Sequence, residues 1–287
     1  TVDVIERIDY SNDSAVALDR SNLSAGKGRL AAAGNKDFGY WAGGYPGPAS
    51  TVQRLDFTND TADAVEKGPL AAVANNFAGT GNANFGYFAG SDGPSGDKSR
   101  VQRIDYANDT ATASERGPLS IAVQGVSATG NKDFGYFGGG GNYAPAKYTT
   151  VSRIEYANDT VTAVAKGPLT VGRFRLAATG NVDFGYFGGG GTPGVVSTID
   201  RIEYANDTVT ASPKGPLTVA RYRLAATGNI SYGYFGGGYA SANSSIIDRL
   251  DFSSDTTAAV RKGDLHTARN YLMASSGGAN ALPQFGG

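Results

Sequence analysis

Hydrophobic and polar residues alternate over short stretches of this chain, which is the pattern of half-buried β-strands. In residues 101–106, Ile104 and Tyr106 face one side of an extended strand, whereas Arg103 and Asp105 face the other. This phrase, an Arg followed by an aliphatic residue, an acid and an aromatic residue, recurs with a period of about 48 residues. Its six copies open at Arg7, Arg54, Arg103, Arg153, Arg201 and Arg249. A supersecondary unit has therefore been copied, and such units become stable when neighbouring copies bury each other's apolar faces.

Each copy has room for four short strands. In the fifth copy we expect them at residues 221–229, 232–238, 245–252 and 256–260. The Gly228-Asn229 pair between the first two tolerates positive φ and suits a tight hairpin. In four copies a Gly-Pro pair follows the fourth strand, and Pro ends ladder pairing because it has no backbone N–H. These pairs are residues 68–69, 117–118, 167–168 and 215–216. Because all connections are short, each copy is expected to be a four-stranded antiparallel meander.

The two ends of the chain complement each other. Residues 4–10 begin inside a third strand, and residues 285–287 stand where a second strand should finish. One blade would then combine strands from both ends and leave no open sheet edge. We therefore predict an all-β fold, a six-bladed β-propeller of four-stranded antiparallel blades whose N- and C-terminal strands share one blade. The shared period predicts a single domain over residues 1–287.

Composition narrows the classes of function. The chain has 287 residues and a formal net charge of -1, and it contains no Cys. The near-neutral charge offers no field for nucleic acid, so no nucleic-acid partner is expected. The missing thiols exclude disulfides, thiolate nucleophiles and sulfur-ligated zinc. No apolar run reaches the roughly 18 residues of a membrane helix, so membrane insertion is not expected either.

The order of motifs within a copy resembles the kelch repeat. An aromatic residue with a Gly pair, as in residues 136–140, precedes a variable loop, an aliphatic-acid-aromatic strand and a later Arg. The resemblance covers the whole chain and implies a propeller. Kelch units usually carry a Trp in the fourth strand, whereas here Val65, Val164 and Val260 stand there and the only Trp is Trp41. The phrases Ala-Asn-Asp-Thr and Phe-Gly-Tyr-Phe-Gly-Gly-Gly are similar to tandem repeats in virion proteins of marine phages.

Catalytic interpretations find little support in the residues. Kelch-type propellers include a copper oxidase branch whose chemistry needs paired His and a Cys-modified Tyr, but His266 is the only His here. The acid of the repeated phrase suggests a glycosidase pair, yet a catalytic pair needs two different environments. An acid copied in every blade is expected instead to pair with the neighbouring Arg or with turn amides. The Gly-rich runs have no following helix to bind phosphate, and no calcium-loop motif appears. We therefore expect no cofactor and no metal.

Variation between copies is concentrated in the loops after the Gly runs. These loops should share one side of the disk, where a rigid scaffold commonly presents binding residues. Their tyrosines offer flat amphipathic surfaces for sugars or for a protein partner. The candidate ligand-binding residues are Tyr45, Tyr143, Lys147, Tyr148 and Tyr239. The alternative is that Pro and Tyr merely stiffen surface loops.

A second difference between copies lies before the first strand. Four blades that are contiguous on a closed ring carry a cation there, whereas two copies have Ala74 and Val123. The four cations are Lys27, Arg173, Arg221 and Arg269. They would form a basic crescent for an acidic polysaccharide or an acidic protein face. Kelch repeats commonly hold an Arg here for structural reasons, which is the alternative.

These observations favour a non-catalytic interaction or structural module. We expect it in a virion, as part of a phage tail or appendage, or in another extracellular assembly. Its partners would be proteins of that assembly or a cell-surface glycan, bound through the variable loops. The first alternative is a carbohydrate-binding, lectin-like propeller, and a glycan-active enzyme is the second.

Overall fold

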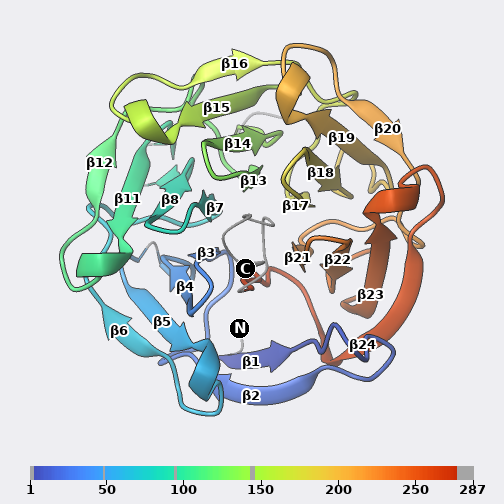
Figure 1. Ribbon diagram of the computed structural model, residues 1–287, viewed down its shortest axis with the longest axis horizontal. Helices are drawn as coiled ribbons and strands as arrows, with labels where there is room; N and C mark the ends of the chain where they lie inside the picture. Colours follow the sequence, from blue (N-terminus) through green and yellow to red (C-terminus); the bar gives the residue numbers. More distant parts are fainter. Residues whose placement is uncertain (1–2, 48, 94–95, 143–145, 277–287) are drawn as a thin grey trace.

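Small antiparallel sheets are arranged around a central axis in the computed structural model of this chain (Figure 1). The structure describes residues 3–47, 49–93, 96–142 and 146–276. Five of the sheets have four strands each, paired in chain order from the innermost strand to the outermost. The arrangement is that of an all-β propeller with four-stranded antiparallel blades, as the repeat predicts.

The five blades are built alike. The first consists of β3 (Ala31–Gly34), β4 (Phe38–Ala42), β5 (Val52–Asp56) and β6 (Val65–Lys67). The second consists of β7 (Ala78–Gly81), β8 (Phe85–Ala89), β11 (Val101–Asp105) and β12 (Ser114–Arg116). The third consists of β13 (Ser127–Gly130), β14 (Phe134–Gly138), β15 (Val151–Glu155) and β16 (Val164–Lys166). The fourth consists of β17 (Ala177–Gly180), β18 (Phe184–Gly188), β19 (Ile199–Glu203) and β20 (Ser212–Lys214). The fifth consists of β21 (Ala225–Gly228), β22 (Tyr232–Gly236), β23 (Ser244–Asp251) and β24 (Val260–Arg269).

Short elements connect and decorate the blades. A hairpin of β9 (Asp92–Gly93) and β10 (Gly96–Asp97) occupies one of the variable loops. A 3-10 helix follows the third strand of every blade, and the helices are η1 (Phe57–Asn59), η2 (Tyr106–Asn108), η3 (Tyr156–Asn158), η4 (Tyr204–Asn206) and η5 (Phe252–Ser254). The fourth strand of the fifth copy begins at Val260, where the expected strand 256–260 ends, because η5 and its following turn take up the intervening residues.

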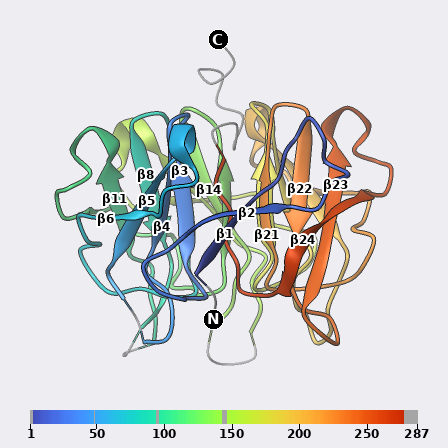
Figure 2. The same ribbon diagram turned by 90° about the horizontal axis from the view of Figure 1, so that it is seen from below.

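The expectation of six four-stranded blades is wrong. Between the first and fifth blades lies a two-stranded antiparallel sheet of β1 (Val4–Arg7) and β2 (Leu18–Asn22), visible from above and from the side (Figures 1 and 2). These strands correspond to the third and fourth strands of the repeat. Residues 285–287, where a second strand was predicted to end, lie outside the described residues, and residues 270–276 form no strand. At this position the described part of the chain therefore contains only the outer half of a blade.

The last outer strand differs from the other four, and its sequence explains why. β6, β12, β16 and β20 have three residues each and end before a Gly-Pro pair, whose Pro has no N–H for the ladder. The last copy has Gly263-Asp264 instead, and β24 runs for 10 residues. Asp264 lies opposite Ile246, and Arg269 lies opposite Ser244. Residues 264–269 thus remain in the outer strand rather than leaving for a new blade.

Apolar cores lie between neighbouring blades. One cluster joins Tyr136 of the third blade to Leu176 and Phe187 of the fourth. The innermost strands consist of small residues, and they approach closely near the axis (Figure 1). A Cβ added to Gly79 of β7 would lie 2.4 Å from the carbonyl oxygen of Ala32 in β3, so only Gly fits there.

Candidate functional site

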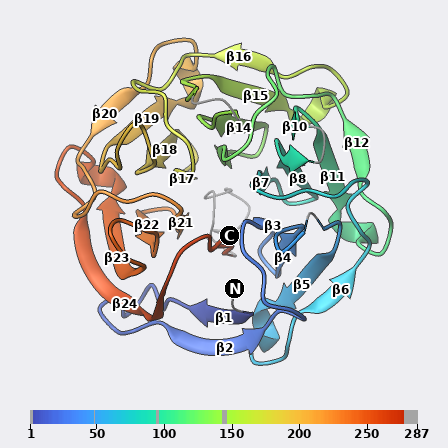
Figure 3. The same cartoon turned by 180° about the vertical axis from the view of Figure 1, so that it is seen from behind.

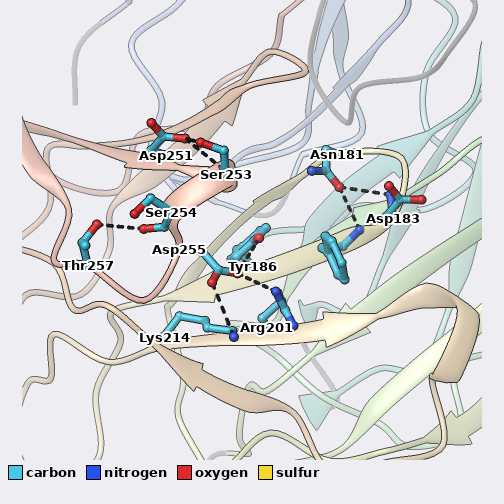
Figure 4. A network of polar contacts seen from close by, with 11 residues as sticks. Asn181, Asp183, Tyr186, Arg201, Lys214, Asp251, Ser253, Ser254, Asp255 and Thr257 are labelled. Atoms are coloured by element: carbon cyan, nitrogen blue, oxygen red, sulfur yellow. Dashed lines mark hydrogen bonds and ion pairs between the residues drawn. The ribbon is translucent and has the colours of Figure 1, made fainter.

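The Arg of the repeated phrase pairs with an aspartate of the next copy. Asp255 Oδ2 accepts hydrogen bonds from Arg201 Nη1 at 2.7 Å and from the Tyr186 hydroxyl at 2.9 Å (Figure 4). Lys214 Nζ lies 3.4 Å from Oδ1 of the same carboxylate. An aspartate that joins an Arg and a Tyr of the preceding blade recurs at Asp109, Asp159, Asp207 and Asp13. The most conspicuous charge in the sequence is therefore used to join blades.

The same contacts close the ring through the N-terminal sheet. Asp13, between β1 and β2, accepts hydrogen bonds from Arg249 Nη1 at 2.8 Å and from the Tyr234 hydroxyl at 2.9 Å, both in the fifth blade. On the other side, Arg7 Nη1 of β1 donates to Asp60 Oδ2 of the first blade at 2.8 Å. The two-stranded sheet is thus bonded to both of its neighbours.

These contacts set the ionisation of the bridging groups. Burial raises the pKa of Asp207, but hydrogen bonds from Lys166 and Tyr136 and the charge of Arg153 outweigh it, so the pKa is lowered. Burial, followed by the hydrogen bond to Asp207, raises the pKa of Tyr136. A neutral phenol donating to an ionised carboxylate is the state that this geometry stabilises.

The acid inside the repeated phrase accepts from a turn amide in three of the five blades, whereas Glu155 and Glu203 make no such side-chain hydrogen bond. Asp105 Oδ1 accepts from the Ala107 backbone N–H at 3.0 Å, and Asp56 and Asp251 accept in the same way at the starts of η1 and η5. These three carboxylates therefore accept a hydrogen bond from a turn amide, one of the two partners expected from the sequence. The neighbouring Arg pairs with an aspartate of the next copy instead.

Two members of the proposed crescent, Arg173 and Arg221, are fully buried. Arg173 Nη2 lies 2.8 Å from Asp200 Oδ2, and its Nη1 donates to the Thr198 carbonyl oxygen at 2.7 Å. Arg221 pairs with Asp248 at 2.8 Å in the same manner. Both guanidinium groups face partners inside their blades rather than solvent.

The other two crescent residues also have partners. Lys27 Nζ donates to Thr51 Oγ1 at 2.7 Å. Arg269 pairs with the almost fully buried Glu6 of β1, which links the end of β24 to the N-terminal sheet. The four cations of the crescent therefore hold elements of the fold together.

The five variable loops lie at one end of the disk, which faces the viewer in Figure 3. Each loop is bridged to the segment before the first strand of its blade, as Gly28 is to Tyr45 and Tyr222 is to Tyr239. Equivalent bridges in all five blades place the loops on the same side. The structure thus groups the variable residues on one face.

The candidate loop residues differ in accessibility. Tyr45 is 47% exposed. Tyr239 packs edge-on against Tyr222, and Tyr148 packs against the core between the second and third blades. Lys147 Nζ lies 4.6 Å from the centre of the Phe174 ring. Tyr143 lies outside the described residues.

A ring of backbone hydrogen bonds, here called the axial ring, surrounds the axis at this end and was not predicted from the sequence. One residue from each copy donates its N–H to the carbonyl of the preceding copy, with N···O distances from 2.7 to 3.2 Å. The six residues, in order, are Arg29, Asn76, Gly125, Arg175, Arg223 and Tyr271, and Arg29 closes the ring by donating to Tyr271. All six have positive φ, between 54° and 60°. Gly and Asn at two of the positions were the only sequence signal, because Arg and Tyr rarely adopt this conformation.

A cavity of about 750 Å³ lies beside the N-terminal sheet. Its apolar lining includes Ile5, Trp41 and Met273, and it also reaches Arg29 and Tyr271 of the axial ring. It occupies the position where the other five blades have their two inner strands.

Within the described part of the chain there is no cluster of three or more His, Asp or Glu side chains suited to a metal ion. The imidazole of His266 lies on β24, exposed, with Nδ1 2.9 Å from Asp19 Oδ2. Among these same residues no helix is long and apolar enough to cross a membrane.

No protein-family model matches the chain, and no curated protein matches it. The propeller is thus identified from its structure, while the kelch and phage resemblances rest on the repeated phrases alone.

Proposed function

We propose that this chain is a non-catalytic interaction module that contacts its partners through the face formed by the variable loops. The supporting observation is the separation of copied from variable residues. The copied Arg, Tyr and Asp side chains join one blade to the next, as around Asp255, whereas residues that differ between copies gather at one end of the disk. Loops held on a rigid scaffold are the common location of binding residues.

The proposal extends to the setting of the module. The phrases Ala-Asn-Asp-Thr and Phe-Gly-Tyr-Phe-Gly-Gly-Gly favour a phage tail or appendage, or another extracellular assembly, with proteins of that assembly as partners. Such a part needs a stiff body and a specific face, which a propeller with bonded blades supplies.

The test compares two surface variants in assembled particles of the virus or cell that encodes the chain. The double variant Tyr45→Ala with Tyr239→Ala removes two aromatic side chains from the variable-loop face. Ile230→Ala is the matched control, because Ile230 is 65% exposed in the hairpin at the opposite end of the fifth blade. We expect the double variant to be lost from particles at least tenfold more than the control, the loss of about 1.4 kcal/mol of binding.

Other outcomes point to other functions. Equal retention of both variants contradicts the proposed face. Glycan-array binding by the wild type that the double variant loses and the control keeps identifies the lectin-like alternative. Turnover of an oligosaccharide in a broad screen identifies a glycan-active enzyme.

A further inference from the structure

Three guanidinium groups converge on one tyrosine at the variable-loop end of the axis. Their carbon atoms lie 4.8 Å (Arg29), 5.1 Å (Arg175) and 4.3 Å (Arg223) from the centre of the Tyr271 ring. All four residues belong to the axial ring, where they occupy adjacent positions. The ring of backbone hydrogen bonds therefore fixes three cations around a single point.

Aromatic rings also contact these guanidinium groups from other directions. Arg29 lies 4.9 Å from the centre of the Tyr45 ring, Arg175 lies 4.8 Å from that of Phe174, and Arg223 lies 4.5 Å from that of Tyr222. Contact with a ring face stabilises the cation without using its N–H groups. The planar forks are thus held in place while their N–H donors remain for a ligand.

Among the described residues, no carboxylate pairs with this cluster. None of their ion pairs includes Arg29, Arg175 or Arg223. Nε of Arg175 and Nε of Arg223 are buried without a hydrogen-bond acceptor in the described structure. Burial lowers the pKa of Arg175, and the nearby Arg223 and Arg29 lower it further against the opposing effect of Tyr271. Three like charges and two unsatisfied donors are costly without an anion.

We propose that Arg29, Arg175 and Arg223, with Tyr271, bind a phosphate or sulfate group at the axis. A tetrahedral oxyanion accepts hydrogen bonds in several directions and matches the forked donors of arginine. The group arrives as a free ion or as an ester on a larger ligand, for which the cavity beside Arg29 and Tyr271 provides space. The site borders the loop residues of the proposed function, since Tyr45 contacts Arg29 and Tyr239 contacts Arg223. Its own test therefore uses variants of Arg175 and Arg223 and leaves both tyrosines unchanged.

The experiment measures binding of inorganic phosphate, inorganic sulfate and phenyl phosphate by calorimetry and thermal unfolding, with NaCl at matched ionic strength as the reference. The variants are Arg175→Gln and Arg223→Gln. Lys132→Gln is the control, because Lys132 lies in an exposed hairpin at the other end of the third blade. We expect at least one of the anions to bind the wild type and the control. The same anion should bind each Arg variant at least about tenfold more weakly.

Stability without the anion separates a binding role from a structural one. If the cluster awaits an anion, Arg223→Gln relieves repulsion and unfolds at the same or a higher temperature than the wild type at low salt. If the guanidinium serves only to support Tyr271, the variant unfolds at a lower temperature and its anion response is unchanged, which overturns the proposal. No response beyond that of NaCl also overturns it. Tighter binding of phenyl phosphate than of inorganic phosphate indicates an ester ligand, and weaker binding indicates a free ion.

Discussion

Arginines two residues apart have opposite roles in this protein. Arg173 is buried and paired with Asp200, whereas Arg175 turns toward the axis without a carboxylate partner among the described residues. The positive φ of Arg175 separates the two, because it redirects the chain just before the innermost strand. The sequence shows both arginines but not their different roles, since an Arg gives no sign in the sequence that its backbone adopts a left-handed conformation.

At the scale of single residues, the bridging aspartates predict loss of stability in acid. The pKa values of Asp207 and Asp13 are lowered in the folded state by hydrogen bonds and positive charges that outweigh burial. Below about pH 4 the unfolded chain therefore takes up protons that the folded chain resists, and stability falls as pH decreases. We expect an unfolding free energy that is steady above about pH 5 and falls steeply below pH 4 in denaturant titrations.

The variant Asp207→Asn tests the assignment of this effect. It removes the charge that Arg153 and Lys166 face, so we expect a loss of about 3 kcal/mol at pH 7. At about pH 2 the Asp207 carboxyl of the unfolded wild-type chain is protonated, so the ionised carboxylate contributes less to folding and the difference from the variant should shrink. Asp183→Asn, at an exposed hairpin, should change stability by no more than about 0.5 kcal/mol. An equal loss for Asp207→Asn at both pH values would contradict the electrostatic explanation.

At the scale of elements, each outer strand ends where the next copy crosses it. Gly215 follows β20, its N–H donates to the Asp255 carbonyl oxygen at 2.9 Å, and an added Cβ would lie 1.6 Å from the Thr257 carbonyl oxygen. That oxygen belongs to backbone and cannot rotate away. The Gly of the Gly-Pro pair is therefore required by contact between copies, while its Pro ends the strand.

Gly215→Ala should lower the unfolding free energy by about 3 kcal/mol or more, because the turn of the next copy must move. Gly194→Ala is the matched control, since an added Cβ there meets nothing within 4 Å. We expect the control to differ from the wild type by no more than about 0.5 kcal/mol in urea unfolding followed by Trp41 fluorescence. Comparable losses in both variants would show that backbone contact at Gly215 is not the cause.

The middle strands of a blade were predictable. The first and fourth strands were placed less well, since β21 begins at Ala225 rather than at residue 221 and β24 begins at Val260. The alternation in residues 101–106 correctly places β11, and Gly228-Asn229 correctly marks the turn between β21 and β22. The 3-10 helices were not predicted. The Arg201–Asp255 pair was not predicted either, because the partner of this Arg lies in the next copy, 54 residues away. Periodicity reports which face of a strand is buried but not which distant residue covers it.

At the scale of the whole molecule, the repeat indicates a closed ring but not how it closes. The copy number alone predicts six equal blades, whereas the structure has five blades and the sheet of β1 and β2. Closure uses backbone as well as side chains: Gly263 donates to the Asp13 carbonyl oxygen at 2.7 Å, and Ala17 donates to that of Asp264 at 2.8 Å. The outer contacts of the repeat thus continue around the ring at the one position where the described residues form no inner strands.

This closure predicts that the N-terminal sheet opens independently of the blades when its contacts are weakened. Asp13→Asn removes the charge shared by Arg249 and Lys262, and hydrogen bonds to a charged group contribute about 1.5–3 kcal/mol each. We expect amide hydrogen exchange in β1 and β2 to accelerate about tenfold or more, while β14 and β18 exchange as in the wild type. Asp207→Asn should instead affect the third and fourth blades, since Asp207 follows η4 of the fourth blade and its partners Arg153 and Lys166 lie in the third. Equal acceleration throughout the chain in Asp13→Asn would mean that the N-terminal sheet and the five blades unfold as one cooperative unit.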